Sequence, residues 1–83
     1  MPAIRPIHYQ ELIRVFEADG FRFDRQEGSH RIYIKAGVPR PLVIPAYRDV
    51  PIFIIRNLLR TAGMSRERYF ELLSPSNKPE GEA

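Results

Sequence analysis

The hydrophobic positions of residues 9–18 repeat with the period of an amphipathic α-helix. Apolar side chains at the i, i+3, i+4 and i+7 spacing define its inner face: Tyr9, Leu12, Ile13 and Phe16. The residues between them are mostly charged or polar. Asp19 and Gly20 follow, and a glycine can adopt the left-handed conformation that ends a helix. The pattern therefore predicts a first helix over residues 9–18.

After Gly20 the hydrophobic period changes from that of a helix to two. Apolar and polar residues alternate in segments of about five residues, which is typical of half-buried strands. The predicted strands are residues 21–25, 31–35 and 40–44. Pro41 must lie at a strand start or at a sheet edge, because proline has no backbone N–H to donate. Short glycine-containing connections between the strands favour an antiparallel meander.

Helical spacing returns after Pro45, which ends the predicted sheet. Pro51 fits the first turn of a helix, where its missing N–H costs little. The inner stripe of this second helix is Ile55, Leu58, Leu59 and Ala62. Gly63 is its predicted C-cap, and Ser65 is the predicted N-cap of a final short helix. The final helix offers a second apolar set for burial: Tyr69, Phe70, Leu72 and Leu73.

The predicted element order is α-β-β-β-α with a short extra C-terminal helix. We expect an α+β fold in which a three-stranded antiparallel sheet has helices on one face, leaving the other face to solvent or to a partner. The same order occurs in double-stranded-RNA-binding domains, which is an analogy of fold alone. Residues 1–73 form one predicted domain. Residues 74–83 are rich in proline, serine and charge, and we expect them to be disordered.

Apolar residues on the second helix exceed what its inner stripe needs. The additional side chains are Ile52, Phe53 and Ile54. Two explanations remain open: the final helix covers this surface, or another protein binds it.

Composition limits the class of protein. A chain of 83 residues makes one small domain, with 43% hydrophobic residues to build a core. It contains no cysteine, which excludes disulfides and thiolate metal sites. Its first residues lack the apolar stretch of a signal peptide, and no apolar run is long enough to span a membrane. We therefore expect a cytoplasmic protein with no membrane association.

The charge of the chain comes mainly from arginine. The net charge is +3, from 13 basic and 10 acidic residues, and nearly all of the basic residues are arginine. The guanidinium fork recognises phosphate through two hydrogen bonds, which the lysine ammonium does not do. This charge indicates a nucleic-acid partner, and the alternative is the solvated surface of a basic domain.

His30 is the candidate catalytic residue. It follows the predicted turn at Glu27–Gly28 and stands at the start of the second strand beside Ser29. Cations near it in the sequence are Arg25, Arg31 and Lys35. An imidazole can act as base or acid near neutral pH, and guanidinium groups can stabilise a charged phosphorus centre. This combination suits the attack of an RNA 2′-hydroxyl on its own phosphate. The alternative is an ordinary surface histidine at a turn.

Strand parity predicts which side chains share a face of the second strand. Ile32 and Ile34 must face the helices, so a regular strand places His30 at the rim of the core-facing side unless a bulge at Ser29 turns it over. The open face then carries Arg31, Tyr33 and Lys35. Such a stripe could hold a phosphate backbone and stack a base on the tyrosine, or it could be a plain solvated strand face.

The rest of the chain offers no site for a metal or a cofactor. His8 is the only other histidine, and its position predicts a residue in the cap region of the first helix. Two isolated histidines without a paired carboxylate motif make a poor metal site. The sequence has no P-loop, dinucleotide-binding glycine motif or nucleophile elbow. We therefore expect no cofactor.

The sequence resembles the HicA toxins over about residues 7–73. The resemblance is carried by Glu11-Leu12-Ile13, Gly20-Phe21, Arg25-Gln26-x-Gly28-Ser29-His30-x-x-Tyr33, Val43-Ile44-Pro45, Ile55-Arg56-Asn57-Leu58-Leu59-Arg60, Ala62-Gly63-Met64-Ser65 and Phe70-Glu71-Leu72-Leu73. The chain departs from the family in two places. The family often starts its first helix with serine or threonine followed by glycine and lysine, where this chain has Pro6-Ile7-His8-Tyr9. Tyr47, Arg48 and Asp49 stand where it often has a histidine and lysines.

The resemblance implies a fold similar to that of double-stranded-RNA-binding domains and a function in a toxin–antitoxin pair. Members are endoribonucleases that cut mRNA without a metal and are silenced by a HicB antitoxin. The essential histidine of the family falls on His30. The residues expected to bind RNA around it are Arg25, Ser29, Arg31, Tyr33 and Lys35. The alternative is a non-catalytic RNA-binding module of the same fold.

Overall fold

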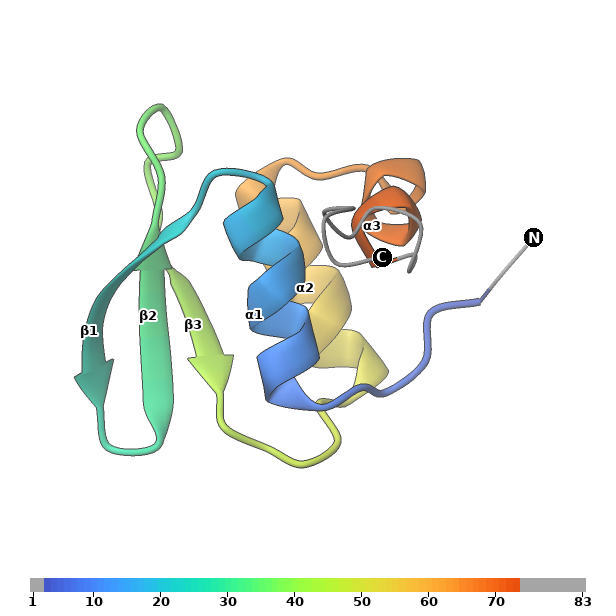
Figure 1. The fold of residues 1–83 in the computed structure, drawn as a ribbon, viewed down its shortest axis with the longest axis horizontal. Helices are drawn as coiled ribbons and strands as arrows, with labels where there is room; N and C mark the ends of the chain where they lie inside the picture. The colour runs from blue at the N-terminus through green and yellow to red at the C-terminus, as the bar shows by residue number, and fades with distance from the viewer. Residues whose placement is uncertain (1–2, 74–83) are drawn as a thin grey trace, which may run out of the picture.

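The computed structural model describes residues 3–73 and has the predicted order of elements (Figure 1). The elements are α1 (Tyr9–Ala18), β1 (Arg22–Glu27), β2 (His30–Ile34), β3 (Leu42–Pro45), α2 (Ile52–Ala62) and α3 (Arg66–Leu73). The three strands form one antiparallel sheet in the order β1-β2-β3. The α+β fold class is therefore confirmed. The predicted disorder of residues 74–83 lies outside the described residues.

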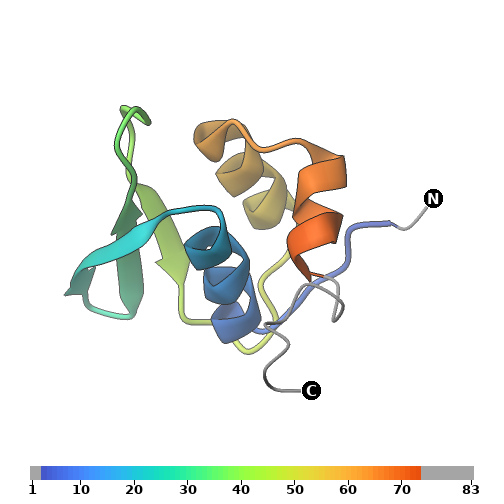
Figure 2. The ribbon, with the colours of Figure 1, turned by 45° about the horizontal axis from the view of Figure 1, so that its top comes forward.

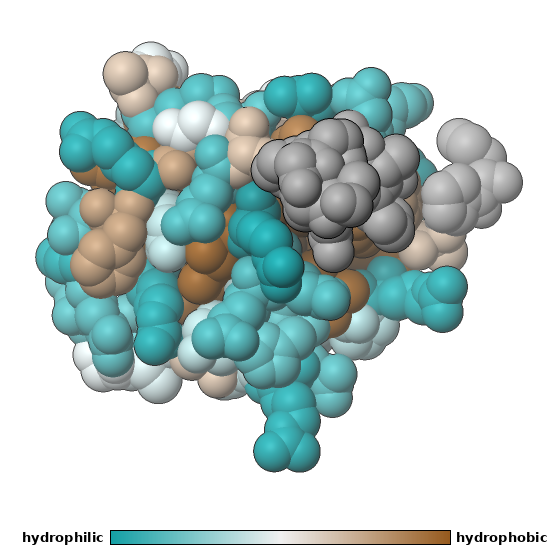
Figure 3. Space-filling view, in the orientation of Figure 1, coloured by the Kyte–Doolittle hydropathy of each residue, from teal (hydrophilic) through white to brown (hydrophobic). Residues whose placement is uncertain are grey.

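The core lies between the sheet and the helices. Both α1 and α2 contact β3, and Figures 1 and 2 show the two helices on the same side of the sheet. Most of the predicted inner stripes of α1 and α2 is buried, at Leu12, Ile13, Phe16, Ile55, Leu58 and Leu59, while Tyr9 and Ala62 are half-buried. In the view of Figure 3, the outer surface is mostly hydrophilic and hydrophobic side chains show between sheet and helices.

The final helix packs against α1. Its Tyr69 is 1% exposed and belongs to the core cluster. Phe53 on α2 remains 66% exposed, so α3 does not cover it. The explanation that the final helix covers the additional apolar surface of α2 therefore fails for Phe53.

The predicted caps explain where the helices begin and end. The His8 side chain caps α1, because its Nδ1 accepts a hydrogen bond from the Gln10 N–H at 3.1 Å. Gly63 ends α2 in the left-handed conformation, with φ of 68°. The Ser65 hydroxyl oxygen accepts a hydrogen bond from the backbone N–H of Arg68 at 3.0 Å. The roles predicted for the histidine, the glycine and the serine are confirmed.

The predicted parity of β2 is wrong. Directly opposite residues of antiparallel strands share a face, and Tyr33 pairs with Leu42 while Arg31 pairs with Ile44. Both partners on β3 are fully buried in the core. Tyr33 is itself 5% exposed, so the face of Arg31 and Tyr33 points toward the helices and not toward solvent.

The opposite face of β2 carries His30 and Ile32. Their partners on β3 are Pro45 and Val43. Ile32 is also buried, so each face of β2 buries an apolar side chain. The parity prediction assumed that one face of the strand is buried and the other is exposed, and β2 does not meet that assumption. The irregularity of the sheet lies in β1 between Phe23 and Arg25, and not at Ser29.

Candidate functional site

His30 is exposed at the end of the sheet where β2 begins. A two-residue turn, Gly28–Ser29, joins β1 to β2 and brings Glu27 opposite His30. Gly28 has φ of 61°, a conformation that glycine adopts without strain, so the turn can be this tight. The turn lies one residue later than the sequence predicted. The imidazole is thus held on regular backbone and open to solvent.

A groove of about 260 Å³ lies beside His30, between α2 and this end of the sheet. Its apolar walls come from Val43, Pro45, Ile54 and Leu58. Its polar lining comes from His30, Tyr47 and Asn57. The sequence analysis did not identify Tyr47 or Asn57 as site residues. Asn57 stands in a segment that resembles the HicA family and Tyr47 in a loop that departs from it, but only the packing of α2 and of this loop brings the two residues to His30.

Backbone hydrogen bonds hold the loop of residues 46–50 to the β1–β2 turn and to the start of α1. The Ala46 N–H donates to the Ser29 carbonyl at 2.9 Å, which ties the loop to the β1–β2 turn. The Tyr9 N–H donates to the Tyr47 carbonyl at 3.1 Å, which ties the loop to the start of α1. The Val50 N–H donates to the Ile7 carbonyl at 2.7 Å. Tyr47 is therefore held in place by its backbone, and its side chain is 46% exposed.

Two of the predicted RNA-binding residues lie close to His30 in the hairpin. Ser29 is exposed in the turn directly before it. Arg25 is exposed on β1, but its guanidinium donates to Glu27 Oε2 and to Asp24 Oδ2, both at 2.6 Å. The hydrogen bond to Glu27, followed by that to Asp24, raises the pKa of Arg25. Much of its charge is thus matched by neighbouring carboxylates.

The other three predicted RNA-binding residues do not share a surface with His30. The half-buried Arg31 lies over the Tyr9 ring, with its guanidinium carbon 5.0 Å from the ring centroid. Lys35 follows the far end of β2, about 16 Å along the strand from His30, and its Nζ lies 3.3 Å from Asp19 Oδ2. The predicted open stripe of cation, tyrosine and cation is therefore absent from this face.

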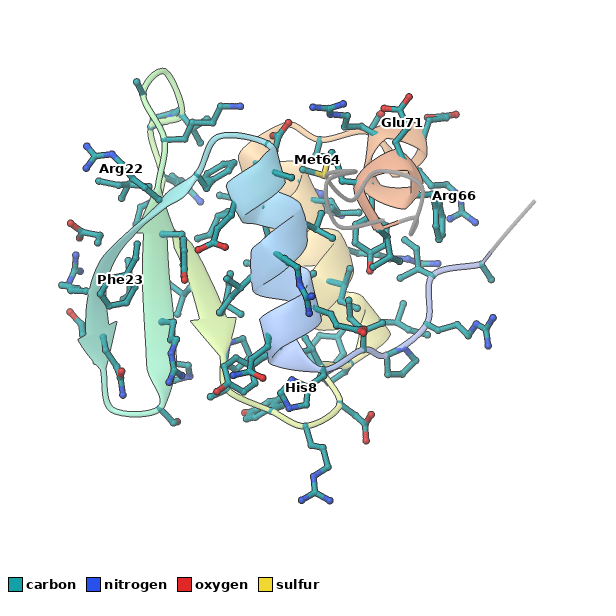
Figure 4. All side chains as sticks on the ribbon, in the orientation of Figure 1. His8, Arg22, Phe23, Met64, Arg66 and Glu71 are labelled. Carbon is teal, nitrogen blue, oxygen red and sulfur yellow. The ribbon has the colours of Figure 1, made fainter. Side chains whose placement is uncertain are left out.

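Tyr33 is placed as a core residue. Its ring packs edge to face with that of Phe23 on the edge strand β1, at 5.7 Å between centroids; Phe23 is labelled in Figure 4. Burial raises the pKa of the Tyr33 hydroxyl, with a smaller contribution from Glu17 that Arg31 opposes. The prediction that Tyr33 offers an exposed stacking surface is wrong.

His8 lies at the same end of the molecule as the loop of residues 46–50, near the start of α1 (Figure 4). Its ring stacks on Tyr9 at 4.8 Å between centroids, and it does not line the groove of His30. Within residues 3–73, no three histidine, cysteine, aspartate or glutamate side chains are grouped so that they could hold a metal ion. In the same part of the chain, no helix is long and apolar enough to cross a membrane.

Comparison with known families yields a match over most of the described chain. The family model described as the HicA toxin of bacterial toxin–antitoxin matches residues 9–64. The match runs from the start of α1 past Gly63 at the end of α2, so it includes all three strands and His30. No curated protein matches the chain.

Proposed function

This chain belongs to the HicA toxin family of bacterial toxin–antitoxin systems, and we propose that it is an RNA-cleaving toxin that uses His30. A cognate antitoxin partner follows from the family, and we propose that this partner is HicB-like. The observation that carries the proposal is an exposed imidazole on rigid backbone beside a groove with aromatic and amide side chains. RNA is then the substrate, and mRNA is the expected target.

The proposed reaction needs only the chemistry of RNA itself. The 2′-oxygen forms a bond to the adjacent phosphorus while the bond from phosphorus to the 5′-oxygen breaks. With His30 as base, the proton of the 2′-hydroxyl goes to the imidazole, and the 5′-oxygen takes a proton from water. The products are a 2′,3′-cyclic phosphate and a 5′-hydroxyl. Ser29 directly precedes His30 and is exposed, so we propose that its hydroxyl donates a hydrogen bond to the same phosphate.

Arginines outside the predicted set supply candidate contacts to the RNA backbone. Arg48 stands next to Tyr47 on the loop that lines the groove, is exposed, and has no carboxylate partner among residues 3–73. Arg56 is exposed on α2 and is likewise unpaired within the described chain. We propose that these two take the phosphate-binding role expected from Arg31 and Lys35, which contact groups of the protein itself.

One observation favours a second candidate function, an RNA-binding module without catalysis. Arg25 is matched by Asp24 and Glu27, and Arg31 lies over Tyr9, so neither guanidinium is free beside His30. A phosphorane would then receive less stabilisation from cations than the sequence suggests. RNA binding that weakens with salt, without cleavage at any protein concentration, would establish this second function.

The test compares purified wild-type protein with two histidine variants on labelled RNA in EDTA. We expect wild type to release products that end in a cyclic phosphate. His30→Ala should cut at least about a hundredfold more slowly. His8→Asn is the matched control, because it removes the other imidazole and keeps an acceptor to cap α1. It should cut like wild type. Equal rates for His30→Ala and wild type would refute the role of His30.

A further inference from the structure

Asn57 presents a hydrogen-bond donor at the wall of the groove. Its Oδ1 accepts a hydrogen bond from Arg60 Nη1 at 3.1 Å. A guanidinium can only donate, so the atom of the amide that faces Arg60 must be the oxygen. The Asn57 Nδ2 is left with its two hydrogens, and no residue of the described chain accepts from it. Asn57 lines the groove, so a residue with an unshared amide donor belongs to its lining.

Tyr47 presents a flat ring on the same groove. The backbone around it is fixed by the hydrogen bonds to Pro45 and Tyr9, at 2.8 and 3.1 Å. Among residues 3–73, no aromatic ring or cation packs on the Tyr47 ring, although it is close to half exposed. An exposed ring on a fixed backbone next to apolar side chains is suited to stack on a nucleobase.

The rest of the groove fits a base better than it fits phosphate. Val43, Ile54 and Leu58 make its walls apolar, and the volume of about 260 Å³ is that of a site for one small flat group. A base in a duplex is already stacked and paired on its edge, so only an unpaired nucleotide can offer its base to this groove. His30 lies at the same groove, next to the place where the attached phosphate would stand.

We propose that this groove is a subsite for the base of an unpaired nucleotide, with Tyr47 stacking on the base and Asn57 Nδ2 donating to an exocyclic oxygen at position 4 of a pyrimidine or position 6 of a purine. The proposal rests on the proposed function, since it takes the phosphate at His30 as its starting point. Uracil and guanine carry a carbonyl oxygen at the position where cytosine and adenine carry an amino group. The subsite therefore prefers uracil and guanine, and Asn57 determines that specificity.

Uridine and cytidine oligonucleotides test the subsite, because their bases differ in the group that Asn57 would read. The full chain with His30→Ala prevents cleavage during the measurement, and fluorescence anisotropy gives the affinity for short single strands. We expect the uridine strand to bind about threefold to tenfold more tightly than the cytidine strand. Asn57→Ala should abolish the preference. Asn57→Asp should reverse it, because a carboxylate accepts from the cytosine amino group.

Two further variants separate base recognition from general affinity. Tyr47→Ala should weaken binding of both strands by at least about fivefold, since stacking does not depend on the base. Arg56→Ala, on the same helix but outside the groove lining, should weaken both strands and leave their ratio unchanged. A change of the ratio in Arg56→Ala equal to that in Asn57→Ala would overturn the proposal.

The outcomes also separate this proposal from the nuclease proposal. Equal binding of the two strands by His30→Ala, or a preference that survives Asn57→Ala, would overturn the subsite even if wild type cuts RNA. A uridine preference that Asn57→Ala removes would support the subsite even if wild type cuts no RNA. Absence of any binding to either strand at low salt would overturn the subsite as well.

Discussion

His30 and Tyr33 lie on opposite faces of β2, although only two residues separate them. His30 is exposed at the groove, and Tyr33 is 5% exposed against Leu42 in the core. An odd spacing on a strand always has this effect, because successive side chains alternate between faces. The strand therefore supplies a solvent-facing imidazole with one face and anchors itself in the core with the other. Substitutions at the two positions should have separable effects.

Tyr33→Ala should destabilise the protein by about 3 kcal/mol, the typical loss for truncating a buried aromatic side chain. Tyr33→Phe keeps the ring and its contact with Phe23, so it should preserve both stability and RNA affinity. Urea unfolding measures the first effect, and binding of a single-stranded RNA measures the second. Tyr47→Ala should have the opposite pattern, because this side chain is exposed: its stability should be close to that of wild type and its RNA binding should be weaker. A Tyr33→Phe protein that is stable yet loses RNA affinity would contradict the placement of Tyr33 in the core.

Gly28→Ala should destabilise the hairpin that presents His30. A Cβ added at Gly28 would meet no atom within 4 Å, so the cost comes from its φ of 61° alone. That cost is about 1 kcal/mol for alanine and less for asparagine, which tolerates the left-handed conformation. Urea unfolding of Gly28→Ala and Gly28→Asn should therefore rank glycine first, asparagine second and alanine last. Equal stability of the alanine variant and wild type would show that the turn relaxes to another conformation.

Stability should decline at alkaline pH because of Tyr69. Its hydroxyl is buried without a hydrogen-bond partner among residues 3–73, and burial raises its pKa to about 12, with a smaller contribution from Glu11. The unfolded value is about 10. A raised pKa favours the neutral phenol in the folded state, so this contribution is complete below pH 10 and fades as pH rises toward 12. The free energy of unfolding should fall by roughly 2 kcal/mol across that range.

Tyr69→Phe is the control for the alkaline decline. It removes the group that ionises and also removes an unpaired hydroxyl. At pH 7 its stability should equal that of wild type or exceed it by up to about 1 kcal/mol. Between pH 10 and 12 it should lose less stability than wild type, with the remaining decline due to Tyr33 and other groups. A Tyr69→Phe protein that loses as much stability as wild type over this range would contradict the assignment to Tyr69.

The sequence predicted the elements of this fold well because each one carries a local signal. The helix period, the caps at Gly63 and Ser65, and the glycine turns are all properties of a few neighbouring residues. The parity of β2 was not predictable in the same way, because Ile32 and Tyr33 are both buried on different faces. The strand that pairs with it is apolar from Leu42 to Pro45 and so carries no alternation of its own.

The candidate site was predictable only in part, for the same physical reason. His30 and Ser29 belong to one hairpin, and local signals placed them correctly at an exposed turn. Tyr47 and Asn57 reach the groove through the packing of α2 and of the loop before it, which no local pattern encodes. Arg31 and Lys35 were predicted to face solvent from the parity of β2, which the pairing with β3 overturned. The carboxylate that binds Arg25, Glu27, is a near neighbour in the sequence, whereas the contact of Lys35 with Asp19 depends on tertiary structure.

Glu27 is the residue whose substitution best tests the electrostatics beside His30. The two residues are cross-strand partners, and the Glu27 carboxylate accepts the Nε hydrogen bond of Arg25 at 2.6 Å. It therefore places a negative charge next to the imidazole and pairs with the Arg25 guanidinium, and both effects disfavour an approaching phosphate. Glu27→Gln should raise RNA affinity about twofold to threefold at low salt, and the gain should vanish at high salt because exposed charges are screened.

Glu27 could also act by positioning His30, and Glu27→Gln would then slow RNA cleavage instead of favouring it. If its carboxylate orients the imidazole, Glu27→Gln should lower the cleavage rate about tenfold while RNA affinity stays equal or rises. Glu67→Gln makes the same change of charge on α3, away from the groove, and should leave both quantities near wild type. Measuring affinity and cleavage rate for the two variants decides between the roles. Faster cleavage with tighter binding assigns Glu27 to limiting RNA affinity, and slower cleavage with unchanged binding assigns it to positioning His30.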